Sequence, residues 1–144
     1  MARKPSRMIE RVLGSKADPI KAMLENVHPD LARYVQDFAY GEVYARPGLG
    51  LIERELLAVT CLTLLNLKPQ LKTHVYGALN VGVTRLQLEE TFIHIALYAG
   101  FPVALSGLLT AKEVFDELDR AETDRDAIDR AGPAKKPRAR KKHA

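Results

Sequence analysis

The stretch LKTHVYGALNVGVTRLQLEETFIHIALYAG, residues 71–100, decides the fold of this chain. It contains two largely apolar segments separated by Gly82, a residue type that commonly ends a helix. The second segment opens with a Thr-x-x-Gln capping box at Thr84, which is typical of a helix start. The stretch therefore predicts an antiparallel pair of helices over residues 69–80 and 84–99.

Turn and cap signals on either side predict four further helices. Asp18-Pro19 is typical of a helix start, and Asp30 can cap the next helix. No alternation typical of strands is present. The chain is therefore predicted to form an all-α, six-helix bundle-like domain. The expected helices span residues 18–28, 31–44, 51–67, 69–80, 84–99 and 102–120.

The length of 144 residues fits one domain with a sizeable core. We expect an N-terminal basic segment (1–16), a helical domain (17–120) and a disordered basic tail (121–144) that has lost apolar periodicity. Nine of the 22 basic residues, and none of the 18 acidic ones, lie in the first seven residues or from Pro133 onward. The body is thus acidic, so nucleic-acid binding is not expected except through the tail.

The segment 56–67 is apolar on nearly all sides of its predicted helix. In so small a domain, we expect partner subunits to cover such a helix, which predicts a homo-oligomer. The segment is too short for a membrane span, which needs about 20 apolar residues. The N-terminus also lacks the apolar region of a secretory signal, so we expect a cytoplasmic protein without membrane partners.

Glu55 and His74 are candidates for a catalytic pair. Glu55 lies among apolar neighbours, where a carboxylate needs a cation or a hydrogen-bond donor. His74, in the next helix, is a plausible partner, and a Glu–His pair can exchange protons near neutral pH. A structural ion pair, or simple exposure of Glu55 at the helix start, would explain the same pattern.

A second polar line on helix 84–99 contains Glu90, His94 and Tyr98 at i, i+4 and i+8. These residues could line a substrate pocket, or they could form the solvated face of an amphipathic helix. No HxxxH or ExxH spacing supports a metal site, so no metal is expected. The single cysteine, Cys61, is about 240° around the helix from Glu55 and is expected to be a small core residue.

Three blocks together resemble the carboxymuconolactone decarboxylase family, which also includes alkylhydroperoxidase-D-like disulfide reductases. The blocks are Arg54-Glu55-Leu56-Leu57-Ala58, LKTHVYGALNVGVT and EETFIHIALYAGFPVAL, and the likeness covers roughly residues 51–118. In the reductase branch a CxxC motif precedes the motif histidine. With His74 at that histidine, the cysteines would fall on Leu67 and Gln70, so the chain resembles the decarboxylase branch and a thiol peroxidase or disulfide reductase mechanism is disfavoured.

The resemblance implies a cofactor-free carboxy-lyase that acts on a small carboxylated lactone or related acid. It implies His74 as acid or base, Glu55 as its orienting partner, and His94, Tyr98 and Glu90 as pocket residues. It also implies a trimer or a hexamer. Leu105 departs from the family pattern, since decarboxylases commonly carry an asparagine near this position. The alternative is a non-catalytic oligomeric protein of the same fold that binds ligands or acts as a scaffold.

Overall fold

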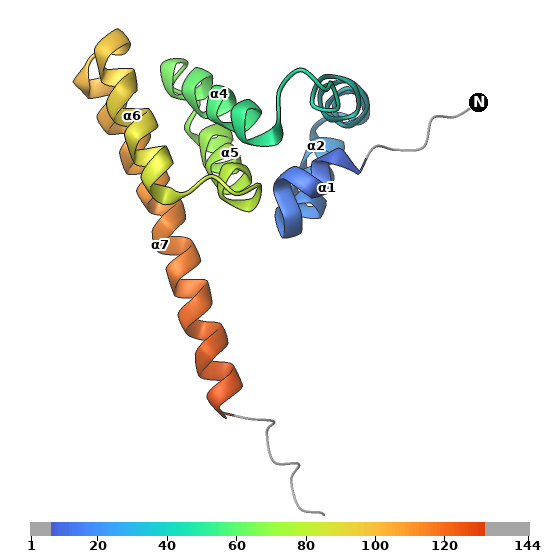
Figure 1. Cartoon of the computed structure of the whole chain (residues 1–144). Helices are drawn as coiled ribbons and strands as arrows, with labels where there is room; N and C mark the ends of the chain where they lie inside the picture. The colour runs from blue at the N-terminus through green and yellow to red at the C-terminus, as the bar shows by residue number, and fades with distance from the viewer. Residues whose placement is uncertain (1–6, 132–144) are drawn as a thin grey trace, which may run out of the picture. The chain divides into compact units, whose positions relative to one another are not determined.

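A computed structural model describes residues 7–131 of the chain, and within this range every regular element is helical, which confirms the predicted all-α class. Figure 1 shows the order of the elements along the chain. They are α1 (Met8–Leu13), the 3-10 turn η1 (Gly14–Lys16), α2 (Ala17–Val27), α3 (Pro29–Arg33), the π-helix η2 (Tyr34–Val43), α4 (Leu51–Leu64), α5 (Lys68–Asn80), α6 (Arg85–Ala99) and α7 (Phe101–Ala131).

Local sequence signals place the ends of the central helices correctly. The capping box at the start of α6 is present in both directions, with Thr84 Oγ1 accepting from the Gln87 N–H and the Gln87 side chain accepting from the Thr84 N–H. A proline, Pro69, lies in the first turn of α5. Gly82 follows α5 with a φ of +107°, a value that favours glycine.

The N-terminal segment contains a helix that the sequence analysis missed. In α1, Ile9, Val12 and Leu13 are buried, because their i, i+3, i+4 spacing puts all three on one face. α2 begins at Ala17 without a side-chain cap, so the predicted Asp18 cap is wrong. Residues 1–6, the first part of the predicted basic segment, lie outside the described range.

The start of the next helical segment also differs from the prediction. His28, rather than Asp30, is the N-cap of α3, and its Nδ1 accepts from the Asp30 N–H at 3.2 Å. α3 then continues as the π-helix η2, in which backbone hydrogen bonds join residues five apart. The last of these bonds runs from the Tyr44 N–H to the Ala39 carbonyl at 2.9 Å.

α7 extends to Ala131, so the predicted helix end near Arg120 is wrong. The segment after Arg120 is rich in alanine, glutamate and arginine, which favour a helix even without an apolar face. Side-chain bonds to the preceding turn accompany it, as between Arg130 Nε and the Asp126 carbonyl at 3.1 Å. Residues 132–144, for which the sequence predicted a disordered basic tail, lie outside the described range.

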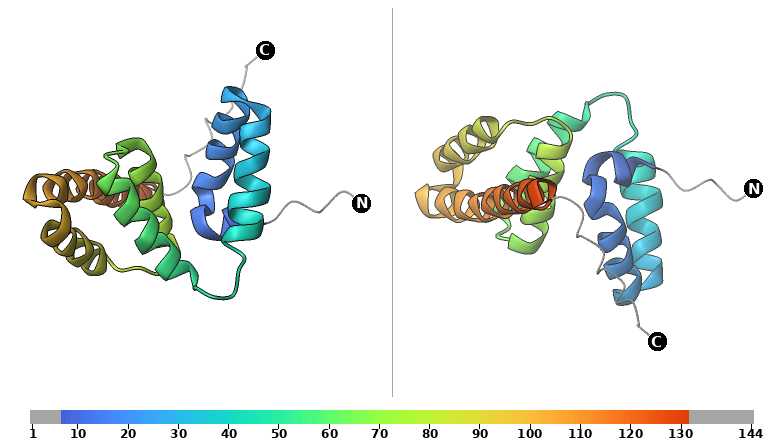
Figure 2. Two further views of the ribbon diagram at one scale, coloured as in Figure 1. Left: turned by 90° about the horizontal axis from the view of Figure 1, so that it is seen from above. Right: turned by 90° about the horizontal axis from the view of Figure 1, so that it is seen from below.

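The chain divides into two compact units with a boundary after Val114, and α1–α6 all belong to the first. Within that unit α4 packs along α5, α1 contacts both α5 and η2, and α6 contacts α4. Figure 2 shows α2, in blue, running beside the cyan helix that α3 begins and η2 continues. The largest fully buried side chains come from α1, α4, α5 and α6, so the core joins α1 to the α4–α5 pair.

One apolar side of α4 remains uncovered in the single chain. Leu57 is 54% exposed, and Leu65, just after the helix, is 66% exposed. This uncovered side fits the expectation that partner subunits cover the helix, which stays a prediction. No helix within residues 7–131 is long and apolar enough to cross a membrane.

Candidate active site

Glu55 and His74 meet within one chain. Glu55, in the second turn of α4, has no solvent exposure. Its Oε2 lies 3.0 Å from His74 Nδ1 on α5, and its Oε1 accepts a hydrogen bond from the Tyr44 hydroxyl at 2.7 Å. A buried carboxylate is costly unless its oxygens are hydrogen-bonded, and here each oxygen has a partner. Simple exposure of Glu55 at the helix start is therefore excluded.

A glycine on α5 makes room for this carboxylate. A Cβ atom at Gly77 would lie 2.8 Å from Glu55 Oε2 and 3.3 Å from side-chain carbons of Val12 and Leu13. The glycine is itself buried. α1 therefore helps to enclose the carboxylate, although this helix was not expected from the sequence.

Two tyrosines from the η2 segment surround the other side of Glu55. Burial raises the pKa of Tyr44 well above its usual range, and the nearby Glu55 charge raises this pKa further. The pKa of Tyr40 is raised for the same two reasons, burial first. Both hydroxyls thus keep their protons at neutral pH, so Tyr44 is a permanent hydrogen-bond donor to the carboxylate.

A cavity of about 490 Å³ opens beside His74. Its lining is mostly apolar and comes from α2, η2, α4 and α5, with polar groups from Gln70, Thr73 and His74 along the α5 side. None of the lining residues is an aspartate, glutamate, lysine or arginine. The residues that line it are Ile20, Met23, Leu24, Val35, Ala39, Tyr40, Tyr44, Ala58, Cys61, Leu62, Gln70, Thr73 and His74.

The prediction for Cys61 is wrong. It was predicted to be a core residue facing away from Glu55, but it is exposed and lines the His74 cavity. The helical angle from Glu55 was sound. The error arose because Glu55 points into the core between α4 and α5, whereas the cavity lies on another side of α4, next to α2 and η2.

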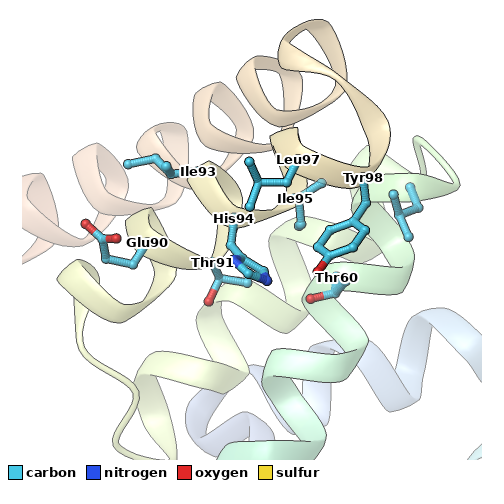
Figure 3. Close-up of a pocket in the computed structure, with 9 residues that line it drawn as sticks. Thr60, Glu90, Thr91, Ile93, His94, Ile95, Leu97 and Tyr98 are labelled. Carbon is cyan, nitrogen blue, oxygen red and sulfur yellow. The ribbon is translucent and has the colours of Figure 1, made fainter.

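Glu90, His94 and Tyr98 lie together in a different hollow. They line a space of about 640 Å³ between α6 and α4, which also includes Thr60 and Leu64. Figure 3 shows the His94 and Tyr98 side chains projecting from α6 toward Thr60. The two rings are 5.4 Å apart between centroids, and Tyr98 is 81% exposed.

The five sequence-predicted site residues are therefore divided between two places in one chain. No residue lines both hollows. Across residues 7–131, no three histidine, cysteine, aspartate or glutamate side chains come together as a metal site would need.

Tyr44 is a site residue that was not predicted from the sequence. The only available signal was the pair of tyrosines at i and i+4 in YGEVY, and that spacing did not show which neighbour they would contact. The contact with Glu55 depends on the turn at residues 46–50, which brings the end of η2 back onto α4. Arg54 secures this turn by donating to the carbonyls of Arg46 and Leu49, at 3.0 and 3.2 Å.

The sequence pattern of the carboxymuconolactone decarboxylase family matches residues 29–113, more than half of the chain, and this range contains all five predicted site residues. The chain belongs to the carboxymuconolactone decarboxylase family. The matched range begins after α2, so α1 and α2 precede the part that the family pattern describes.

Several known proteins are similar to this chain over most of its length. The 4-carboxymuconolactone decarboxylase of Acinetobacter baylyi is 36% identical over 74% of this chain and 81% of its own length. The nitrosuccinic acid decarboxylase of Metarhizium robertsii is 34% identical over 63% of this chain and 64% of its own length. An uncharacterised 15.0 kDa protein of Paracoccus denitrificans is 28% identical over 67% of this chain and 73% of its own length. The two relatives named for an activity are both decarboxylases.

Proposed function

We propose that this protein is a cofactor-free decarboxylase that acts on a small carboxylated lactone or related acid. The observation that carries the proposal is the hydrogen bond between His74 Nδ1 and the buried Glu55, at the edge of a ligand-sized cavity. The decarboxylase names of the Acinetobacter and Metarhizium relatives support the reaction class.

The geometry suits His74 to proton transfer. When Nδ1 carries a proton and donates it to Glu55, the other ring nitrogen, Nε2, remains available for a ligand. Glu55 holds the ring in this tautomer and stabilises the imidazolium once Nε2 takes up a proton. His74 is therefore the proposed acid or base, and Glu55 the proposed orienting group.

The reaction needs one proton donor and one group that accepts an electron pair. Breaking the bond between the ring carbon and the carboxylate releases CO₂ and leaves its electron pair on the remaining fragment. The conjugated lactone carbonyl can accept this pair, and His74 can then protonate carbon. The apolar lining around His74 favours this step. A substrate carboxylate that loses its hydration is destabilised more than the anion that forms when CO₂ leaves, because the charge of that anion is more dispersed.

Glu90, His94 and Tyr98 remain the proposed substrate-pocket residues, but one chain keeps them apart from His74. We therefore propose that they reach the reaction site from a neighbouring subunit of a trimer or hexamer. The uncovered apolar residues on α4 and α6, such as Leu57 and Leu97, support an assembly of this kind. We also propose that the protein acts in the cytoplasm.

The test is CO₂ release from 4-carboxymuconolactone by the wild type and by His74→Ala. We expect turnover to fall by about 10²- to 10⁴-fold, the usual contribution of a general acid or base. His28→Asn is the matched control, since it removes a histidine outside the cavity and keeps a side chain that can cap α3. Equal turnover in wild type and His74→Ala, with both proteins folded, would refute the role of His74.

The alternative, a non-catalytic ligand-binding or scaffold protein, predicts a different result. The departure at Leu105 favours it, since a polar group common in the decarboxylases is missing there. In that case a panel of lactone acids would bind without losing CO₂, and His74→Ala would change only their affinity. Calorimetry together with CO₂ measurement on the same samples distinguishes the two functions.

A further inference from the structure

The carboxylate of Glu55 can adopt its observed orientation only while both of its oxygens are satisfied. One oxygen is bonded to His74 and the other to the Tyr44 hydroxyl, and the side chain has no exposure to water. Without Tyr44, Oε1 would be a buried acceptor without a partner. The negative charge of such a carboxylate would then have His74 as its remaining hydrogen-bond partner, so the bond to His74 would strengthen.

Tyr44 is itself held firmly in place. Its backbone N–H closes the last π-type turn on Ala39, and its ring packs on Tyr40 with centroids 4.9 Å apart. The Arg54 guanidinium lies 5.9 Å from the centre of the Tyr44 ring. Turns of π-helix occur frequently at functional sites, and this one delivers a hydroxyl to the carboxylate behind the proposed acid or base.

We propose that Tyr44 is a positioning residue that sets the orientation and charge of Glu55, and through Glu55 the protonation of His74. It donates to Oε1, leaves Oε2 for His74 Nδ1, and draws carboxylate charge away from the imidazole. This inference rests on the proposed acid–base role of His74 only where activity is concerned, since the hydrogen-bond chain exists whether or not the protein turns over a substrate.

The elements packed around Glu55 and His74 present both ionisable and apolar groups to this chain of hydrogen bonds. Tyr40, Tyr44, Arg54 and Cys61 are ionisable residues that lie near Glu55 and His74. α1 presents apolar Val12 and Leu13 to the carboxylate side, and α2 presents only apolar side chains to the cavity. Of these groups, Tyr44 forms the hydrogen bond to Glu55, so a change at Tyr44 acts on the pair directly.

The experiment is a titration of the His74 ring, followed by NMR in the wild type, Tyr44→Phe and Tyr40→Phe. Loss of the Tyr44 hydroxyl concentrates negative charge on Glu55, so the pair should hold its proton more tightly. We expect the His74 titration curve of Tyr44→Phe to move to higher pH, by about half a unit to one unit, which corresponds to one lost charge-assisted hydrogen bond in a coupled pair. Samples of His74→Ala assign the resonance.

Tyr40→Phe is the matched control. It makes the same chemical change in the neighbouring buried ring, and within the described residues Tyr40 forms no hydrogen bond to Glu55. Its His74 curve should coincide with that of the wild type. A Tyr44→Phe curve that does not move, or that moves no more than the Tyr40→Phe curve, would overturn the inference. If Tyr44→Phe does not fold, 3-fluorotyrosine placed at residue 44 keeps the ring and is a stronger hydrogen-bond donor to Glu55, so it should move the His74 curve to lower pH. An unmoved His74 curve in that protein would overturn the inference in turn.

Activity gives a second and separate readout. Tyr44→Phe should lower kcat about tenfold with little change in KM, and should displace the pH–rate profile to higher pH together with the NMR curve. A displaced NMR curve in a protein without any decarboxylase activity would uphold the role of Tyr44 and refute the proposed function instead.

Discussion

Gly77 lies directly against the carboxylate of Glu55, so that a Cβ atom added at this glycine would be 2.8 Å from Oε2. Contacts this short force one side to move, and Val12 and Leu13 block the other directions at 3.3 Å. The absence of a side chain at Gly77 is therefore a condition for the bond between Glu55 and His74.

Gly77→Ala should consequently disrupt the site and destabilise the fold. We expect a loss of about 1–3 kcal/mol in the free energy of unfolding, the usual effect of overpacking a core, and a loss of turnover comparable to that of Glu55→Ala. Denaturant titration and a CO₂ assay measure the two effects. Gly48→Ala is the control, because a Cβ at Gly48 meets no atom within 4 Å. Gly77→Ala with wild-type turnover would show that the carboxylate can move freely.

The two buried tyrosines predict a loss of stability at alkaline pH. The pKa of Tyr40 and that of Tyr44 are raised above the ordinary value of 10.0, so the unfolded chain releases these protons first. Their contribution to stability is complete below about pH 10 and declines as the pH rises further, toward the folded-state values. Melting temperatures between pH 8 and 11 should fall less steeply in Tyr40→Phe than in the wild type. Parallel curves for the two proteins would contradict this prediction.

Gln70 should contribute to ligand binding rather than to proton transfer. It lies one helical turn before His74 and lines the same cavity, where no lysine or arginine is present to meet a carboxylate. Gln70→Leu should raise KM about tenfold, the effect of roughly 1.4 kcal/mol of lost binding, and leave the pH–rate profile in place. A fall in kcat with unchanged KM would instead assign Gln70 to the chemical step.

The division of the predicted site between two hollows predicts complementation between subunits. If the His94 hollow of one subunit completes the His74 cavity of its neighbour, oligomers of His74→Ala alone or His94→Ala alone are inactive. Oligomers reassembled from both variants should regain part of the activity, because some sites then contain neither substitution. A mixture that exchanges subunits yet remains inactive would place His94 outside the reaction site.

The apolar side chains on α6 and at the start of α7 predict the surface used for assembly. Leu97 is 76% exposed and Phe101 is 80% exposed, and Ile93 and Leu105 lie nearby on the same two helices. Leu97→Glu should reduce the assembled mass measured by light scattering, because a charge at a buried interface is costly. Val27→Glu, at a position that is 64% exposed and precedes the family-matched range, should leave the mass unchanged. An unaltered mass for Leu97→Glu would exclude this surface.

The sequence predicted those features that depend on local chemistry. The capping box at Thr84 placed α6, and the apolar surroundings of Glu55 indicated that it needed a partner, which the structure shows to include His74. These inferences succeeded because a cap or a buried charge imposes a requirement that few arrangements satisfy.

Other features depend on contacts between distant segments and could not be predicted from local patterns. Tyr44 reaches Glu55 only because the turn after η2 folds back onto α4, and Val12 of α1 meets Gly77 across more than sixty residues. The exposure of Cys61 likewise depends on where α2 and η2 leave space beside α4. The end of α7 was predicted too early for another reason. Helix propensity and local side-chain hydrogen bonds can support a helix that has no apolar periodicity.

The α2 wall of the His74 cavity has a consequence for how this protein could acquire new substrates. Ile20, Met23 and Leu24 precede residue 29, where the match to the family begins, whereas Glu55 and His74 lie within the matched range. One wall of the cavity thus comes from outside the matched range, whereas the rest of its lining lies inside that range. Substitutions at Ile20, Met23 and Leu24 alone would change the size of the cavity and leave Val12 and Leu13 in place beside Glu55, which makes α2 the natural target for changing which ligands fit.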